Sequence, residues 1–225
     1  MGLKAIFIDM GGTIETFRFT HQYRTENCHV IRDCLATKGI SLPINDEQLA
    51  DMITTNISIY SRISMKTNIE LPSAEIWANY IFKDFNLRKE ALEDISEELA
   101  FLYETRLYIR EMRPEVPSVL QKIKTLGLTI GCISNTQSIT QVPYSMRSYG
   151  IYDYFEHIIL SSEYGHRKPD PSIFYYAASL AKLPTGECAY IGDKINRDIL
   201  GAKRAGYSLA VQIKHQYDNG EIDEG

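Results

Sequence analysis

The first strong pattern along the chain is a short apolar run that ends in a carboxylate. Residues 4–9 read Lys-Ala-Ile-Phe-Ile-Asp, and Gly11 and Gly12 follow closely. A continuous apolar run of this length is typical of a strand that is buried on both faces of a parallel sheet, and the two glycines suit a tight turn. The run therefore predicts a buried strand with Asp9 at its tip.

A long helical region follows this strand. From about His21 to Leu126 the chain reads as long helical stretches, and no convincing strand is present. Asn45 or Asp46 offers an N-cap for the first clear helix. The most legible helices are expected at residues 46–63, 72–85 and 87–109. The pattern thus predicts an all-helical block within the chain.

Helices and strands alternate after Pro114. Strands are expected at residues 129–133, 157–160, 189–191 and 208–212, and helices up to residue 126, from about residue 137, and at residues 171–181 and 197–205. Such alternation is typical of a parallel sheet with helices on both faces and right-handed crossovers. The predicted fold class is therefore α/β, a Rossmann-like, doubly wound parallel sheet core accompanied by a smaller all-helical domain.

Composition and charge exclude several kinds of partner. The 225 residues are 44% hydrophobic and 24% charged, which is ordinary for a globular protein. A net charge of -5 argues against a nucleic-acid or anionic-membrane surface, because both require a positive field. The apolar runs fall far short of the roughly 20 residues of a spanning helix, so no membrane partner is expected. The residues indicate no particular oligomeric state.

The termini and cysteines indicate a cytoplasmic protein. The N-terminus lacks the basic-then-apolar layout of a secretory signal. The four cysteines form no Cys-x-x-Cys pair and are expected to be free structural thiols. The last ten residues are polar and acidic and are expected to fray.

Chemically useful side chains follow the apolar runs. The runs end in Asp9, in the pair Ser134 and Asn135, in a loop that carries Lys168, and in Asp193. In an open parallel sheet, ligands bind beyond the carboxyl ends of the strands. Two carboxylates can hold a hard divalent cation, while a lysine and a hydroxyl can neutralise and orient phosphoryl oxygens. One aspartate oxygen then remains to attack phosphorus.

These residues, in this order, resemble the haloacid dehalogenase (HAD) superfamily of hydrolases. The resemblance runs from Lys4 to about Gln212, and its four motifs correspond to residues 5–13, 130–135, 167–174 and 190–206. It implies that residues 1–16 and 114–225 form the α/β core domain. Residues 17–113 would then form a helical cap domain that closes over the site and selects substrates.

The resemblance implies a phosphatase-type hydrolase that acts on a small phosphorylated metabolite through an aspartyl-phosphate intermediate. Asp9 would be the nucleophile, and Ser134 would bond a phosphoryl oxygen. Lys168 would balance the negative charge of the nucleophile and the phosphate. Gly12 and Asn135 would contribute to phosphate binding.

The resemblance also implies a Mg²⁺ cofactor. Its ligands would be the Asp9 carboxylate, the backbone carbonyl of Gly11, and Asp193, with Asp198 reaching the metal directly or through water. Mg²⁺ usually keeps several waters and takes one or two carboxylates, which fits this sparse set. Asp198 also has a plainer explanation, because an acid in the first turn of a helix interacts favourably with the helix dipole.

Position 11 departs from the family pattern. Family phosphatases usually carry there a second aspartate, which protonates the leaving oxygen and then activates water. Here the residue is Gly11, so acid-base help worth about 10²- to 10⁴-fold is missing or comes from elsewhere. Glu15, His21 or a residue of the cap are the candidates to replace it.

The departure at position 11 raises three alternative functions. Haloacid dehalogenation needs no acid, but dehalogenases typically lose the metal-binding acids that Asp193 and Asp198 provide here, so it is disfavoured. A phosphonoacetaldehyde hydrolase would keep the metal and use a cap lysine as a Schiff base. A catalytically impaired protein that binds a phosphorylated ligand is the third alternative. The candidate Schiff-base lysines are Lys38, Lys66, Lys83 and Lys89.

Overall fold

A computed structural model describes residues 2–214 and contains a five-stranded parallel sheet in the order β5-β4-β1-β6-β7. This arrangement confirms the predicted α/β fold class. The acidic tail that was expected to fray lies outside the described residues. The strands are β1 (Ala5–Ile8), β4 (Thr129–Ser134), β5 (His157–Leu160), β6 (Cys188–Gly192) and β7 (Leu209–Gln212).

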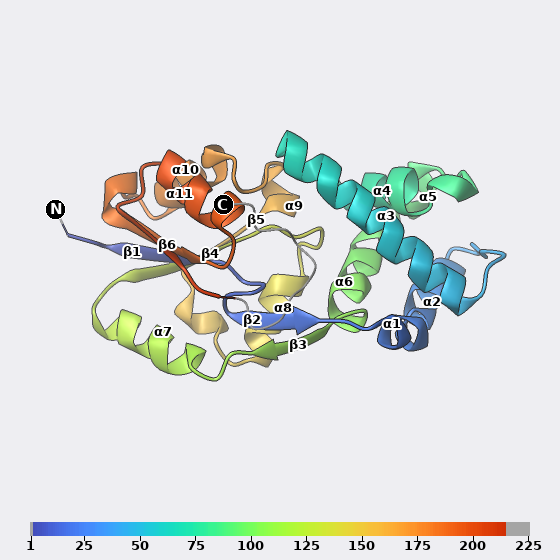
Figure 1. The fold of residues 1–225 in the computed structure, drawn as a ribbon, viewed down its shortest axis with the longest axis horizontal. Coiled ribbons are helices and arrows are strands. Elements are labelled where there is room, and N and C mark those ends of the chain that lie inside the picture. The colour runs from blue at the N-terminus through green and yellow to red at the C-terminus, as the bar shows by residue number, and fades with distance from the viewer. Residues whose placement is uncertain (1, 215–225) are drawn as a thin grey trace.

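Helices cover both faces of this sheet (Figure 1). The helices are α7 (Val116–Thr125) and α8 (Gln141–Ser148) on one face, and α10 (Pro171–Leu180) and α11 (Leu200–Arg204) on the other. Phe7 packs with α10, whereas its neighbour Ile8 packs with α7 and α8. Successive strand residues point to opposite faces, so a continuous apolar run is what a doubly covered strand requires.

The helical block has a hydrophobic core of its own. The large buried side chains Tyr60, Trp77 and Leu99 lie within it. The block lies beside the carboxyl ends of the sheet strands in Figure 1. Its α-helices are α1 (His21–Asn27), α2 (His29–Ala36), α3 (Asp46–Thr67), α4 (Ser73–Ile76), α5 (Lys89–Leu92) and α6 (Ser96–Arg106). Asn45 caps α3 in a capping box with Gln48.

Two of the helices predicted in the helical block are interrupted. Residues 72–85 form α4, a π-helical turn (Trp77–Ile81) and a 3₁₀ turn (Lys83–Phe85). The helix expected at 87–109 is broken by a 3₁₀ turn (Glu93–Ile95), which precedes α6. Leu92 and Ile95 are both buried, and side chains three residues apart eclipse in a 3₁₀ turn, so this geometry directs both into the core.

A short antiparallel ribbon corrects the expectation that no strand lies between residues 21 and 126. It consists of β2 (Glu15–Arg18) and β3 (Ile109–Met112), with Phe17 opposite Arg110. The partner strands are far apart in sequence, so β3 gives no local signal. The ribbon carries the chain between the sheet and the helical block, and it places Phe17 and Arg110 side by side.

Polar contacts fasten the helical block to the sheet domain. The carboxylate of Glu97 on α6 accepts hydrogen bonds from the backbone N–H groups of Ile139 and Thr140, at 3.1 and 3.0 Å. It also accepts one from the Ser138 hydroxyl, at 2.6 Å. These donors lie in the loop before α8. Along the described chain, no helix combines the length and apolarity that crossing a bilayer demands.

Candidate active site

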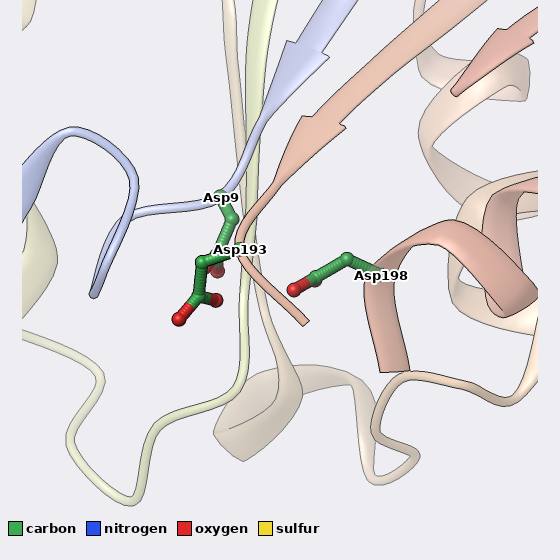
Figure 2. A group of neighbouring side chains, drawn as sticks. All are labelled: Asp9, Asp193 and Asp198. Carbon is green, nitrogen blue, oxygen red and sulfur yellow. The ribbon is translucent and has the colours of Figure 1, made fainter. Parts of the chain in front are cut away.

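Four strand ends bring the predicted site residues together at one edge of the sheet. Asp9 follows β1, Ser134 ends β4, and Asp193 follows β6, while Lys168 comes from the loop after β5. All four residues are at least nine-tenths buried. Figure 2 shows Asp9 and Asp193 converging with Asp198, which comes from the helical turn after β6. Ionisable groups buried so closely together must be paired, protonated or bound to a ligand.

Lys168 lies at the centre of this cluster. Its ammonium Nζ is 2.7 Å from Asp9 Oδ1 and 2.7 Å from Asp198 Oδ1, and it donates to the backbone carbonyl of Ile133 at 2.9 Å. Burial opposes the charged form, but Asp198 and Asp9 outweigh it and raise the pKa of Lys168. The side chain is therefore a fixed positive charge beside Asp9.

Tyr190 is a site residue that sequence reasoning missed. Its hydroxyl oxygen is 2.7 Å from Lys168 Nζ, 3.1 Å from the carbonyl oxygen of Ile133 and 3.2 Å from Asp198 Oδ1. The signal was a hydroxyl in the middle of an apolar strand, since a buried tyrosine usually finds a hydrogen-bond partner. Tyr190 thus helps to hold the Lys168 ammonium in place.

We expect Tyr190→Phe to lower the free energy of unfolding by about 1 kcal/mol, the net value of an ordinary hydrogen bond. The three ammonium protons of Lys168 keep three acceptors, so turnover should fall only severalfold. Thermal denaturation and steady-state kinetics measure the two effects. Tyr207→Phe is a matched control, because the Tyr207 hydroxyl bonds the Phe174 carbonyl oxygen at 2.8 Å away from the carboxylates. Complete inactivity of Tyr190→Phe would contradict this positioning role.

Asp193 is the least satisfied of the three carboxylates. Arg197 Nη2 lies 3.5 Å from its Oδ1, yet within the described chain neither carboxylate oxygen accepts a hydrogen bond. Burial and the nearby charge of Asp9 raise the pKa of Asp193 to about 7. Burial likewise raises the pKa of Asp9, although Lys168 opposes it. A further positive charge nearby would therefore stabilise the ionised forms of both Asp9 and Asp193.

Asp198 is the best compensated carboxylate. Oδ1 accepts from Lys168, and Oδ2 accepts from the backbone N–H of Lys194 at 3.0 Å. Burial would raise its pKa, but Lys168 and Arg197 prevail and hold that pKa below its usual value. Each oxygen of Asp198 therefore has a partner already.

The cluster fits a hard divalent cation. Ligand oxygens of Asp9, Asp193 and Asp198 lie within 4.8 Å of one another. The two orphaned oxygens of Asp193 are the donors such a cation would satisfy, because oxygen ligands suit Mg²⁺. Gly11 lines the cavity that adjoins Asp9.

The predicted phosphate-binding residues fall into two groups. Ser134 is buried and lines the cavity next to Asp9. The side-chain amide of Asn135 instead exchanges hydrogen bonds with the backbone of Lys168, at 2.9 and 3.0 Å, and so fixes the Lys168 loop against β4. The backbone N–H of Gly12 donates to the Glu15 carbonyl oxygen at 2.7 Å, and its positive φ of 88° suits glycine in this turn.

The cavity in front of Asp9 has a volume of about 130 Å³ and lies between the sheet and the helical block. Sheet-side loops contribute Ser134, Gln137 and Arg167, and α6 contributes Glu104. The β2–β3 ribbon contributes Phe17 and Arg110. Residues of the sheet domain and of the helical block thus enclose one small polar space around the Asp9 carboxylate.

Comparison with known proteins finds a matching family and several relatives. A family model described as haloacid dehalogenase-like hydrolase matches residues 3–206. The glyceraldehyde 3-phosphate phosphatase of Methanothermobacter thermautotrophicus is 26% identical over 98% of this chain and 90% of its own length. The enzyme of the same name from Methanopyrus kandleri is 31% identical over 50% of this chain. That match spans 47% of the archaeal protein, so the chain covers about half the length of this relative.

A solved structure has the same fold over nearly the whole chain. The HAD phosphatase from Thermococcus onnurineus superposes with a TM-score of 0.60 at 23% identity. The superposition covers 96% of this chain and 88% of that one. The shared architecture therefore includes the helical block as well as the sheet.

Proposed function

Because the chain belongs to the haloacid dehalogenase-like hydrolase family, we propose that it is a Mg²⁺-dependent phosphatase acting on a small phosphorylated metabolite. The observation that carries this proposal is the buried group of Asp9, Lys168 and Asp193, in which Asp9 also lines a small polar cavity. The names of its relatives support a phosphate monoester as substrate. The cavity volume of about 130 Å³ favours a small leaving group.

In the proposed reaction, an Asp9 carboxylate oxygen attacks phosphorus, the bond from phosphorus to the ester oxygen breaks, the alcohol leaves, and an aspartyl-phosphate is formed. Ser134 donates to a phosphoryl oxygen, and the Lys168 ammonium neutralises charge beside the nucleophile. Water then attacks the phosphorus, which releases phosphate and regenerates Asp9. Asp9, Asp193 and the Gly11 carbonyl would hold Mg²⁺, with Asp198 in contact through water because its oxygens already have partners. Bound Mg²⁺ supplies positive charge that stabilises the phosphoryl oxygens.

We further propose that residues 17–113 act as a cap that selects the substrate, with residues 1–16 and 114–225 as the core. The separate hydrophobic core of the helical block and its contribution to the cavity wall support this division. We propose the cytoplasm as its location, because the four cysteines are free and buried, as expected from the sequence, and free thiols suit a reducing compartment.

The test is hydrolysis of p-nitrophenyl phosphate with and without Mg²⁺. We expect turnover that requires Mg²⁺, stops on addition of EDTA and returns when excess Mg²⁺ is restored. A screen of small sugar and hydroxy-acid phosphates then ranks substrates by kcat/KM. Hydrolysis that continues unchanged in metal-free buffer would refute the Mg²⁺ requirement, and no hydrolysis of any phosphate ester would refute the phosphatase proposal.

The phosphonatase alternative lacks its key residue in this cavity. Among the described residues that line the cavity, none is a lysine of the helical block. Lys38, Lys66 and Lys83 are exposed, and Lys38 forms an ion pair with Asp94. A Schiff base requires a lysine that reaches the substrate, so these positions do not favour carbon–phosphorus cleavage.

A further inference from the structure

An aromatic ring stands where an acid at position 11 would project. A Cβ built on Gly11 would lie 3.2 Å from Cε1 and 3.5 Å from Cδ1 of Phe17. Phe17 lines the cavity with Asp9 and has no proton to give. The apolar Phe17 ring therefore occupies the space into which a side chain at position 11 would extend.

The two acid-base candidates that the sequence suggested are placed elsewhere. Glu15 is fully buried, where Arg110 pairs with it and the Tyr149 hydroxyl donates to it at 2.8 Å. His21 is exposed on the surface of the helical block, where its Nδ1 lies 3.2 Å from Oδ1 of Asp51. Neither residue lines the cavity in the described structure. A group from the helical block is the remaining candidate of the three.

Glu104 on α6 is a carboxyl group of that block in the cavity wall. Its Oε2 accepts a hydrogen bond from Arg110, which lies opposite Phe17 in the β2–β3 ribbon. Among the described residues, Arg110 engages Oε2 and no donor to Oε1 is found, so the carboxyl of this lining residue keeps one oxygen that a ligand can engage. Arg110 also donates to the backbone carbonyl of Glu104 at 2.6 Å, which fixes the end of α6 beside the ribbon.

Burial and the neighbouring charge of Glu15 favour a protonated Glu104. One guanidinium bridges two carboxylates, those of Glu15 and Glu104, and Glu15 also has Tyr149 as a donor. Burial raises the pKa of Glu104, and the charge of Glu15 adds to this rise, while Arg110 and Arg24 oppose it without reversing it. A buried carboxyl that retains its proton can act as a general acid.

We propose that Glu104 is the general acid and base of this enzyme, in place of the side chain that position 11 lacks. The proposal rests on the phosphatase function proposed above. As Asp9 attacks phosphorus, the bond from phosphorus to the leaving oxygen breaks, and that oxygen takes the Glu104 proton and departs as an alcohol. The Glu104 carboxylate then removes a proton from water while the water oxygen attacks phosphorus. The bond to Asp9 breaks, phosphate leaves, and Glu104 is protonated again.

This assignment adds a requirement on the substrate. The leaving oxygen must lie between Asp9, which follows β1, and Glu104, which belongs to the helical block. Turnover therefore needs the helical block and the sheet domain together, with the Glu104 carboxyl held by Arg110 at the cavity wall.

The test compares wild type with Glu104→Gln, a neutral variant of the same shape whose amide oxygen still accepts from Arg110. With p-nitrophenyl phosphate, whose leaving group departs without a proton, rapid mixing should show a burst of nearly one equivalent of p-nitrophenol. Slow steady-state turnover should follow, because the base of the second step is missing. With glycerol phosphate no burst is expected. For both substrates kcat should fall by roughly 10²- to 10⁴-fold. KM should fall with kcat for p-nitrophenyl phosphate, because only the second step is slowed, and should change little for glycerol phosphate, because both steps are slowed.

Two further variants separate catalysis from folding. Glu98→Gln changes an exposed glutamate of the same helix and should leave both reactions at wild-type rates. Glu104→Asp keeps the carboxyl on a shorter side chain and should restore part of the turnover, which a purely structural role would not predict. Circular dichroism of each variant checks folding.

The outcomes distinguish this inference from the function on which it rests. If wild type is active and Glu104→Gln retains its turnover, or raises KM alone, then Glu104 is not the acid and base. If wild type hydrolyses no phosphate ester with Mg²⁺, the phosphatase proposal fails and the role of Glu104 fails with it.

Discussion

Replacing Asp9 with asparagine should reduce Mg²⁺-dependent phosphate ester hydrolysis by about 10⁴-fold or more, as removal of a catalytic nucleophile typically does. An amide oxygen is a poor nucleophile and cannot form the aspartyl-phosphate. The variant also removes one of the three carboxylates that would attract the cation. Initial rates with p-nitrophenyl phosphate at saturating Mg²⁺ measure the loss. Mass spectrometry of wild type trapped with substrate, compared with the variant, checks for the phosphorylated aspartate.

The same substitution should leave the fold intact. The Lys168 ammonium loses Asp9 as a counter-charge but keeps Asp198 at 2.7 Å, so no charge is left unpaired at this position. Burial disfavours ionised Asp9, and the charge of Asp9 raises the pKa of its neighbour Asp193, so a neutral side chain relieves repulsion between them. We therefore expect no drop in melting temperature in metal-free buffer. Asp153→Asn, an exposed change of the same chemistry, serves as control and should retain full activity. Turnover of Asp9→Asn within tenfold of wild type would contradict the assignment of the nucleophile.

The second large effect is expected for Lys168→Met. This change removes the ammonium that lies 2.7 Å from both Asp9 and Asp198, and it leaves two buried carboxylates without their shared cation. Breaking a buried ion pair in this way typically costs about 3–5 kcal/mol of stability. Urea denaturation in metal-free buffer at neutral pH should show a loss of this size. Turnover should also be lost, because the nucleophile and the phosphate no longer have a neighbouring positive charge.

Added Mg²⁺ should partly compensate for the lost ammonium. A cation that binds the folded state stabilises it by mass action, and the variant has more uncompensated negative charge than wild type. We expect Mg²⁺ to raise the melting temperature of Lys168→Met more than that of wild type. Lys122→Met, an exposed change on α7, controls for the loss of one surface lysine. A Lys168→Met protein as stable as wild type without metal would show that the ion pairs contribute little.

The local sequence was sufficient to predict the sheet and the residues at its edge. The apolar run before Asp9 and the alternation after Pro114 predict buried parallel strands, because a strand covered on both faces cannot alternate with polar residues. The carboxyl ends of parallel strands meet at one edge, so Asp9, Ser134 and Asp193 were expected together there. In the structure Ser134 lines the same cavity as Asp9, and Asp193 lies beside Asp9 in the carboxylate cluster. Their catalytic roles remain predictions.

Only the tertiary structure decided which partner each polar side chain has. The pairing of β2 with β3, and the burial of Glu15 beside Arg110, join segments far apart along the chain. Hydrophobic periodicity reports which face of a local segment is buried, but it carries no information about what packs against that face. For that reason the sequence did not predict that Glu104 lies in the cavity wall. Its place in the cavity wall follows from how the helical block packs on the sheet domain.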